Sequence, residues 1–406
     1  MKLMKIDHYW YLITQELFHG DGKGTFVEVC CKVVWKEYKM KAKKIMVVFG
    51  TRPEAIKMCP LVKELKTRVS FHTIVCVTGQ HREMLDQVLD TFQIVPDYDL
   101  SVMKPKQTLF DLTVNMLEKM QKLLEEVEPD LVLVHGDTST TFVAALASFY
   151  LQVPVGHVEA GLRTYNIHAP YPEEFNRQAV GIVSAFHFAP TEGAKENLLK
   201  EGKRQETIFV TGNTAVDALM TTVREEYDHE HLIWAKDSRL IMITAHRREN
   251  LGEPMRNMFR AIKRILDETP DLKAIYPIHR NPVVREAAEE IFGHTDRLRI
   301  IEPLEVTDFH NFMSRAYIIL TDSGGIQEEA PSLGIPVLVM RDTTERPEGI
   351  AAGTLKLVGT AEETIYASFR ELLEDQGVYK KMSQANNPYG DGKASKRIAD
   401  LLVEKL

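Results

Sequence analysis

Short runs of apolar residues, most of them rich in valine and isoleucine, alternate with longer amphipathic segments along most of this 406-residue chain. A run of four to six apolar residues between turn-forming residues is typical of a strand that is buried on both faces of a parallel sheet. Strands that alternate with helices predict an α/β fold. The strands predicted for a first sheet are Ile45–Phe49, Thr73–Val77, Leu131–Val134, Val155–Val158, Phe186–Ala189 and Ile208–Thr211.

The same alternation begins again after Asn213 and predicts a second sheet. Its predicted strands are Leu240–Thr244, Lys273–Pro277, Leu298–Ile301, Tyr317–Thr321 and Pro336–Val339. A chain of 406 residues is also too long for one ordinary core. We therefore predict two doubly wound, Rossmann-like domains, residues 43–211 and 212–393, with a ligand cleft between them. The amphipathic segment Ala394–Leu406 predicts a closing helix that joins the first domain.

The first 39 residues differ from the rest of the chain. They contain two of the three tryptophans and two of the four cysteines, and they show no sustained helix or strand period. We expect residues 1–39 to be an extension outside the core fold. Two interpretations stay open: the native chain starts at Met40, or the extension is strain-specific and packs on the surface.

Composition excludes several classes of protein. A hydrophobic content of 44% with 27% charged residues is that of a soluble globular protein, and the absence of 18 consecutive apolar residues predicts no transmembrane helix. A net charge of −8 argues against nucleic acid as the main partner. Cys30 and Cys31 are adjacent and no CxxC pair occurs, so neither a disulfide framework nor a zinc site is expected. No secretory signal is recognised, and we expect a cytoplasmic protein.

Polar residues after the predicted strands are candidates for function, because ligands of open parallel sheets bind beyond the carboxyl ends of the strands. The sequence GTRPE follows the first strand and begins a predicted helix, with Pro53 near its first position. Arg52 and Lys57 place positive charge where the helix dipole already attracts anions. We therefore expect a phosphate group to bind here. No GxGxxG sequence occurs, so the NAD fingerprint is absent.

Acidic residues follow three later segments of the predicted first domain. Asp137 and Glu159 each follow a strand, and Glu173 lies in the first turn of a helix. For Asp137 a helix N-cap is the alternative interpretation. Crowded carboxylates raise one another's pKa, which suits proton transfer near neutral pH. A metal site made of Glu159 with His135 and His157 is conceivable, but strand alternation and spacing do not favour it.

The predicted second domain contributes a histidine and a glycine-rich turn. His246 follows a strand and precedes two arginines, and its side chain titrates in a range useful for catalysis. Ser323, Gly324 and Gly325 can present backbone N–H groups to a diphosphate at a helix N-terminus, and Glu329 can reach a ribose.

Nine motifs, in order from about Lys43 to the C-terminus, are similar to those of the non-hydrolysing UDP-N-acetylglucosamine 2-epimerases. They are FGTRPEAIKM, GQHREMLDQVL, LVHGDT, HVEAGLRT, YPEEFNR, TGNTAVDAL, TAHRREN, LTDSGGIQEEAPSLGIPVLVMRDTTERPE and NPYGDGKAS. The resemblance implies a glycosyltransferase-B-type fold and a homodimer that needs no cofactor. It also implies reversible conversion of UDP-N-acetylglucosamine (UDP-GlcNAc) to UDP-N-acetylmannosamine (UDP-ManNAc) for cell-envelope polysaccharides. The implied route is elimination of UDP to 2-acetamidoglucal, followed by its re-addition.

The resemblance also implies roles for individual residues. The implied catalytic residues are Asp137, Glu159, Glu173 and His246. The implied substrate-binding residues are Arg52, Lys57, Phe309, Ser323, Gly324, Gly325, Glu329 and Arg346. An allosteric site for a second UDP-GlcNAc is implied at Gln80 and His81, with Glu174 and Arg177 as neighbours. The segment Ile301–Asp308 departs from the family's pattern, which puts the uracil contacts in doubt.

Three other functions fit the same sequence. A hydrolysing epimerase would release UDP and free N-acetylmannosamine. A glycosyltransferase of the same fold would need an acceptor groove, which the sequence does not indicate. A non-catalytic UDP-sugar sensor would have no use for three carboxylates and His246.

Overall fold

The computed structural model describes residues 2–6, 9–13, 42–79, 82–104, 107–344 and 346–406. The chain divides into two compact units, Met1–Ala42 and Lys43–Leu406. In the first unit, β1 (Lys2–Ile6) pairs antiparallel with β2 (Tyr9–Ile13). The sequence analysis predicted no strand here, because the hydrophobic period is missing. The segments KLMKI and YWYLI are nevertheless rich in apolar and aromatic residues, which favour strands without strict alternation.

The second unit begins with a seven-stranded parallel sheet of order β5-β4-β3-β6-β7-β8-β9. Its strands are β3 (Lys43–Phe49), β4 (Phe71–Val77), β5 (Tyr98–Asp99), β6 (Leu131–His135), β7 (Val155–Val158), β8 (Phe186–Ala189) and β9 (Ile208–Val210). All strands predicted for this sheet are confirmed, and only the two-residue β5 was missed. The strand order reverses between β3 and β6, so the loops after these two strands flank a topological switch point.

A six-stranded parallel sheet of order β12-β11-β10-β13-β14-β15 follows. Its strands are β10 (Arg239–Thr244), β11 (Leu272–Pro277), β12 (Leu298–Ile301), β13 (Ile318–Thr321), β14 (Val337–Val339) and β15 (Leu355–Leu357). The second reversal lies between β10 and β13. The loops after these strands contain His246 and Ser323, so the fold brings these two segments to one place.

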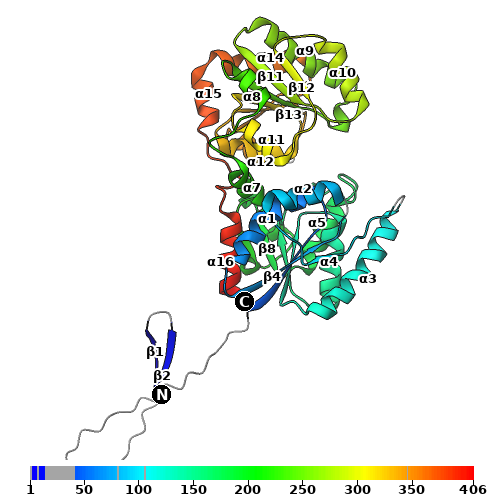
Figure 1. Ribbon diagram of the computed structural model, residues 1–406, viewed down its shortest axis with the longest axis vertical. Coiled ribbons are helices and arrows are strands. Elements are labelled where there is room, and N and C mark those ends of the chain that lie inside the picture. Colours follow the sequence, from blue (N-terminus) through cyan, green and yellow to red (C-terminus); the bar gives the residue numbers. More distant parts are fainter. Residues whose placement is uncertain (1, 7–8, 14–41, 80–81, 105–106, 345) are drawn as a thin grey trace, which may run out of the picture. The chain divides into compact units, whose positions relative to one another are not determined.

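Helices cover both faces of the first sheet. They are α1 (Arg52–Lys66), α2 (Arg82–Phe92), α3 (Leu109–Val127), α4 (Ser139–Tyr150), α5 (Glu173–Val183) and α6 (Glu192–Lys200), with a 3-10 turn at Gln205–Thr207. Ile45 and Val47 of β3 pack with α1 and α2, whereas Met46 and Val48 pack with α3, α4 and α5. Alternate residues of this buried strand therefore pack in two different cores, one on each face of the sheet. Helices α3, α4 and α5 lie together on one of these faces (Figure 1).

The second sheet is covered in the same way. Its helices are α8 (Glu230–Ala235), α9 (Glu253–Glu268), α10 (Pro282–Phe292), α11 (Val306–Met313), α12 (Gly324–Glu329), α13 (Pro347–Ala351), α14 (Glu362–Glu374) and α15 (Gln376–Ser383), with 3-10 turns at Arg248–Asn250 and Ala330–Leu333. Ile241 and Ile243 of β10 pack with α9, α10 and α14, whereas Leu240 and Met242 pack with α8, α11 and α12. Helices therefore cover both faces, as the alternation predicted.

Two further helices, α7 (Thr214–Thr222) and α16 (Ala394–Lys405), join the sheets. Ala218 of α7 packs in a core of the first sheet, and the next residue, Leu219, packs in a core of the second. The predicted C-terminal helix is confirmed as α16, and its Ile398 and Leu402 pack in the same first-sheet core as α1. Among the described residues, no helix is long and apolar enough to cross a membrane.

Candidate functional site

A cavity of about 390 Å³ lies at the carboxyl ends of the strands of both sheets. Six predicted site residues line it: Arg52, His246, Phe309, Ser323, Gly325 and Glu329. His279 and His310 line it as well, and so do Pro303, Leu304 and Val306 from the segment that departs from the family's pattern. The wall therefore carries cationic, acidic and imidazole groups together with apolar surface, which suits a charged ligand with a flat ring.

The start of α1 places Arg52 at the cavity. Thr51 is the N-cap, and its side chain accepts from the backbone of Glu54, while the Glu54 carboxylate accepts from the N–H of Thr51 at 2.8 Å. The same carboxylate accepts from the Thr138 hydroxyl at 2.6 Å, which ties the loop after β3 to the loop after β6. Arg52 Nη2 lies 3.4 Å from the backbone oxygen of Leu304 in the second sheet's half.

Glu159, directly after β7, forms a partly buried ion pair with Lys57 of α1. Burial by itself raises the pKa of Glu159, but the charges of Lys57 and His135 outweigh it and hold the pKa well below its ordinary value. Burial likewise lowers the pKa of Lys57, but Glu159 and Glu328 outweigh that effect and the pKa is raised. Glu159 also has a left-handed backbone with φ of +63°, which is strained for a residue with a β-carbon and is often found at functional sites.

Asp137 is paired with Arg177 of α5, whose Nε and Nη2 donate to one carboxylate oxygen at 2.9 and 2.6 Å. The N-cap of α4 is Thr138, which accepts from the N–H of Thr141 at 3.1 Å. The alternative interpretation of Asp137 as a helix cap is therefore wrong. Glu173 begins α5, one turn before Arg177, and is half-buried.

Glu174 is a structural residue. It is fully buried and accepts from the backbone N–H of Thr164 at 3.0 Å and of Tyr165 at 3.1 Å. Its other partners are Arg177 and Gln178. The four contacts hold the loop before α5 in place and leave Glu174 little capacity for a second ligand.

His246 is held by Asp322, the first residue after β13. Asp322 Oδ2 accepts from the backbone N–H groups of His246 and Arg247, each at 2.9 Å. His246 Nδ1 lies 3.6 Å from Asp322 Oδ1, and the His246 ring stacks on His279 with 5.5 Å between centroids. Burial lowers the pKa of His246; Asp322 opposes this effect and His279 adds to it. The imidazole is therefore neutral at neutral pH, with Nδ1 facing a carboxylate.

The glycine-rich turn forms the start of α12, with Ser323 as the N-cap. A β-carbon at Gly324 would lie 2.6 Å from Nη1 of Arg346 and would displace this guanidinium from its position. Arg346 Nε donates to Glu328 Oε1 at 2.7 Å. Glu329 at the end of α12 faces the cavity, and His310 Nε2 lies 3.7 Å from its carboxylate.

Sequence reasoning missed several residues of this site. Asn213 donates from Nδ2 to Glu159 Oε2 at 2.9 Å and to Glu328 Oε2 at 2.7 Å. Asn213 and His279 both follow strands, so the rule that ligands bind at strand ends would have found them. Glu328 gave no such signal, because its neighbour Glu329 offers the same chemistry and burial is not visible in the sequence.

The structure thus brings together most of the predicted site residues. One connected group runs from the Lys57–Glu159 pair through Asn213 and Glu328 to Arg346, which lies against Gly324. Asp137 precedes α4 and pairs with Arg177 of α5, and Glu173 begins α5. Gln80 and His81 lie outside the described residues. Within the described part of the chain, no group of histidine, cysteine and acidic residues is arranged to hold a metal. His157 instead pairs with the backbone oxygen of Gly136 at 2.7 Å, and burial lowers its pKa to about 3.

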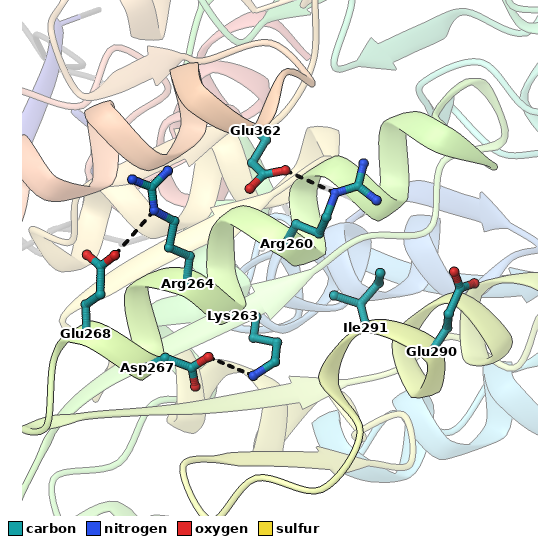
Figure 2. A pocket seen from close by; sticks show the side chains of 8 residues that line it. All are labelled: Arg260, Lys263, Arg264, Asp267, Glu268, Glu290, Ile291 and Glu362. Carbon is teal, nitrogen blue, oxygen red and sulfur yellow. Dashed lines mark hydrogen bonds and ion pairs between the residues drawn. The ribbon is translucent and has the colours of Figure 1, made fainter.

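A larger and more open hollow lies over α9, α10 and α14 (Figure 2). Its charged side chains pair with one another: Arg260 with Glu362, Lys263 with Asp267, and Arg264 with Glu268. Because these charges are already compensated and exposed, the hollow offers no evident binding chemistry.

Most of this chain is similar in sequence and structure to known proteins. A family model described as UDP-N-acetylglucosamine 2-epimerase matches residues 63–403, which extend from α1 to α16. The UDP-N-acetylglucosamine 2-epimerase of Bacillus subtilis strain 168 is 62% identical over 364 residues, covering 90% of this chain and 96% of the relative. A crystal structure of a UDP-N-acetylglucosamine 2-epimerase has a TM-score of 0.84 at 59% identity, covering 90% of this chain and 96% of that one. The Neisseria meningitidis enzyme, solved with UDP-GlcNAc bound, has a TM-score of 0.81 at 49% identity, covering 89% and 100%.

Proposed function

Because the chain belongs to the UDP-N-acetylglucosamine 2-epimerase family, we propose that it interconverts UDP-GlcNAc and UDP-ManNAc without releasing the free sugar. The observation that carries the proposal is the partly buried ion pair of Lys57 and Glu159, in a unit whose cavity is lined by Arg52, His246 and Ser323. Lys57 directly follows Ile56, which also lines the cavity. This site offers an ionised carboxylate for proton transfer and cationic groups for a diphosphate. The solved Neisseria relative binds UDP-GlcNAc, which supports the choice of substrate.

The proposed reaction is an elimination followed by an addition. The C2 hydrogen of the sugar is not next to a carbonyl group, so it is removed while the C1–oxygen bond breaks. The C2–H electron pair forms the C1–C2 double bond of 2-acetamidoglucal, and UDP leaves with the electrons of the C1–oxygen bond. A UDP oxygen then attacks C1 again, while C2 receives a proton on the opposite face.

The residues of the site fit the two ends of this reaction. We propose that Asp137, Glu159 and Glu173 exchange protons with C2, because a carboxylate near the sugar can accept and return a proton. We propose that His246 and Arg346 stabilise the negative charge that develops on the diphosphate. Arg52, Lys57, Phe309, Ser323, Gly324, Gly325 and Glu329 are proposed to bind the rest of UDP.

Product analysis tests the proposal against its rivals. Purified protein incubated with UDP-GlcNAc should yield UDP-ManNAc in ion-pair chromatography, with total UDP-sugar constant. Equal amounts of UDP and free N-acetylmannosamine would instead identify a hydrolysing enzyme. Unchanged UDP-GlcNAc, with turnover only after an acceptor sugar is added, would identify a glycosyltransferase.

We propose that the enzyme is a homodimer that buries the outer faces of α3, α4 and α5. Large apolar side chains are exposed there: Phe110 at 84%, Tyr150 at 64% and Ile182 at 74%. Apolar surface of this kind often marks an interface between subunits.

In sedimentation velocity, the wild type should run as a dimer, and the Phe110→Asp variant should shift toward monomer. Val69→Asp is the matched control, because Val69 is 97% exposed in a turn elsewhere; a dimer in all three proteins would contradict this interface.

We also propose that residues 1–39 lie outside the catalytic unit. We divide that unit into two domains: residues 43–211 joined by the C-terminal helix, and residues 212–393. The unit Lys43–Leu406 contains both parallel sheets and every proposed site residue that the structure describes. A chain starting at Met40 should therefore keep kcat and KM within about twofold of the full chain, because the unit that contains the site is left whole. A large loss of turnover in this variant, with an unchanged melting temperature, would assign the extension a part in catalysis.

A further inference from the structure

Two buried polar side chains that have no role in the proposed chemistry connect the halves of the unit that contain the two parallel sheets. Asn213 lies between β9 and α7, Glu328 lies in α12, and each is 1% exposed. Asn213 Nδ2 donates to Glu159 Oε2 at 2.9 Å and to Glu328 Oε2 at 2.7 Å. One amide group therefore holds a carboxylate from each half of the unit.

The orientation of this amide is set by a helix cap. Asn213 is the N-cap of α7, and its Oδ1 accepts from the N–H of Ala215 at 2.9 Å. Because the oxygen is committed to the helix, the nitrogen must face the two carboxylates. The start of α7 thus fixes the direction in which Asn213 donates.

Glu328 in turn fixes Arg346. Its second oxygen, Oε1, accepts from Arg346 Nε at 2.7 Å. The guanidinium lies against Gly324, where a β-carbon would be 2.9 Å from Cζ. Gly324 and Glu328 are four residues apart in α12 and so lie on one face of that helix. The same helix therefore makes room for the guanidinium and sets the direction of its Nε.

Packing alone does not account for Glu328. Burial raises its pKa, and the nearby charge of Glu159 adds to this effect while Arg346 and Lys57 oppose it. An apolar side chain of similar volume often fills such a buried position at lower free-energy cost than a carboxylate. The charge is therefore better explained by what it holds.

We propose that Glu328 and Asn213 are positioning residues of the epimerisation: Glu328 fixes the guanidinium of Arg346, and Asn213 ties Glu328 to Glu159. The group that binds the diphosphate and the group that transfers the proton are thereby held at a constant separation. This inference rests on the proposed function, which assigns those two roles to Arg346 and Glu159.

A double-mutant cycle tests the link between Glu328 and Arg346. Glu328→Gln keeps the size of the side chain and removes its charge, and we expect kcat/KM to fall about 10- to 100-fold, as for loss of a charge-assisted hydrogen bond. Arg346→Ala should lower kcat/KM further. Because Glu328 acts through Arg346, the double variant should match Arg346→Ala alone. Independent effects that multiply in the double variant, or an unchanged Glu328→Gln enzyme, would overturn the proposal.

The same cycle measured on UDP affinity by calorimetry separates this inference from the proposed function. If the wild type binds UDP but does not epimerise, the proposed function fails, whereas non-additive effects on UDP affinity still support the Glu328–Arg346 link. Additive effects on UDP affinity reject the link whether or not the protein turns over.

Asn213→Ser tests the second link while keeping the helix cap, since serine also caps α7. The variant should melt like the wild type and lose about tenfold in kcat, because one shorter hydroxyl cannot donate to both carboxylates as the amide does. An unchanged kcat at an unchanged melting temperature would show that Asn213 only caps the helix.

Discussion

Replacing Glu159 by glutamine should lower kcat by about 10³-fold, within the range typical of a lost acid–base group, and leave UDP bound. Glu159 is partly buried, ionised and paired with Lys57, and it accepts from Asn213 at 2.9 Å. Glutamine has the same shape and keeps an oxygen for Asn213, but it cannot exchange a proton with C2. Initial rates of UDP-ManNAc formation and UDP affinity by calorimetry measure the two effects separately.

Glu201→Gln is the matched control for this variant. Glu201 is also a partly buried glutamate in an ion pair, with Arg163 at 2.6 Å, but we assign it no part in the reaction. It should keep kcat within about twofold, because changes away from a site act mainly on stability. A Glu159→Gln enzyme that retained a tenth of the wild-type kcat would remove Glu159 from proton transfer.

His246→Ala should lower kcat by about 10²- to 10³-fold, which is the loss expected when a donor to developing negative charge is removed. His246 lines the cavity, and Asp322 holds the backbone N–H groups of His246 and Arg247 at 2.9 Å. The variant should lower kcat more than it raises KM, because the diphosphate gains negative charge only as the C1–oxygen bond breaks. Steady-state kinetics checks the split, and an equal rise in KM with kcat unchanged would contradict it.

The pH profile gives a second readout of His246. Its folded pKa is depressed below that of a free histidine, so the neutral form and the stability that depends on it are present at neutral pH. Both are lost as the pH falls through the folded value. Asp322→Asn removes the charge that raises this pKa, so the acid limb of kcat should move to lower pH. A limb that stayed at the wild-type pH would show that Asp322 does not act on His246.

Much of the fold could be predicted because its strands are buried on both faces and therefore read as continuous apolar runs. Observed strand ends lie within two residues of those predicted for both sheets. The short β5 (Tyr98–Asp99) and β15 (Leu355–Leu357) were missed, since two or three residues carry no recognisable pattern. Arg52, His246 and Ser323 were found as site candidates because each lies in the loop that follows a predicted strand.

The rest of the site depends on contacts between distant parts of the chain. Asn213 and Glu328 are 115 residues apart, and nothing near either residue indicates that one amide bridges two carboxylates. The N-cap of α4 also could not be predicted from the sequence, although its two candidates, Asp137 and Thr138, are adjacent. Both residue types cap helices well, and only the backbone conformation at Thr138 decides between them.

Proton NMR of the purified protein with UDP-GlcNAc in deuterated water tests the central claim most directly. Removal and return of the C2 proton predicts that UDP-ManNAc appears and that deuterium enters C2 of both epimers, with no free N-acetylmannosamine. UDP-ManNAc that retains hydrogen at C2, or release of the free sugar with UDP, would contradict the account.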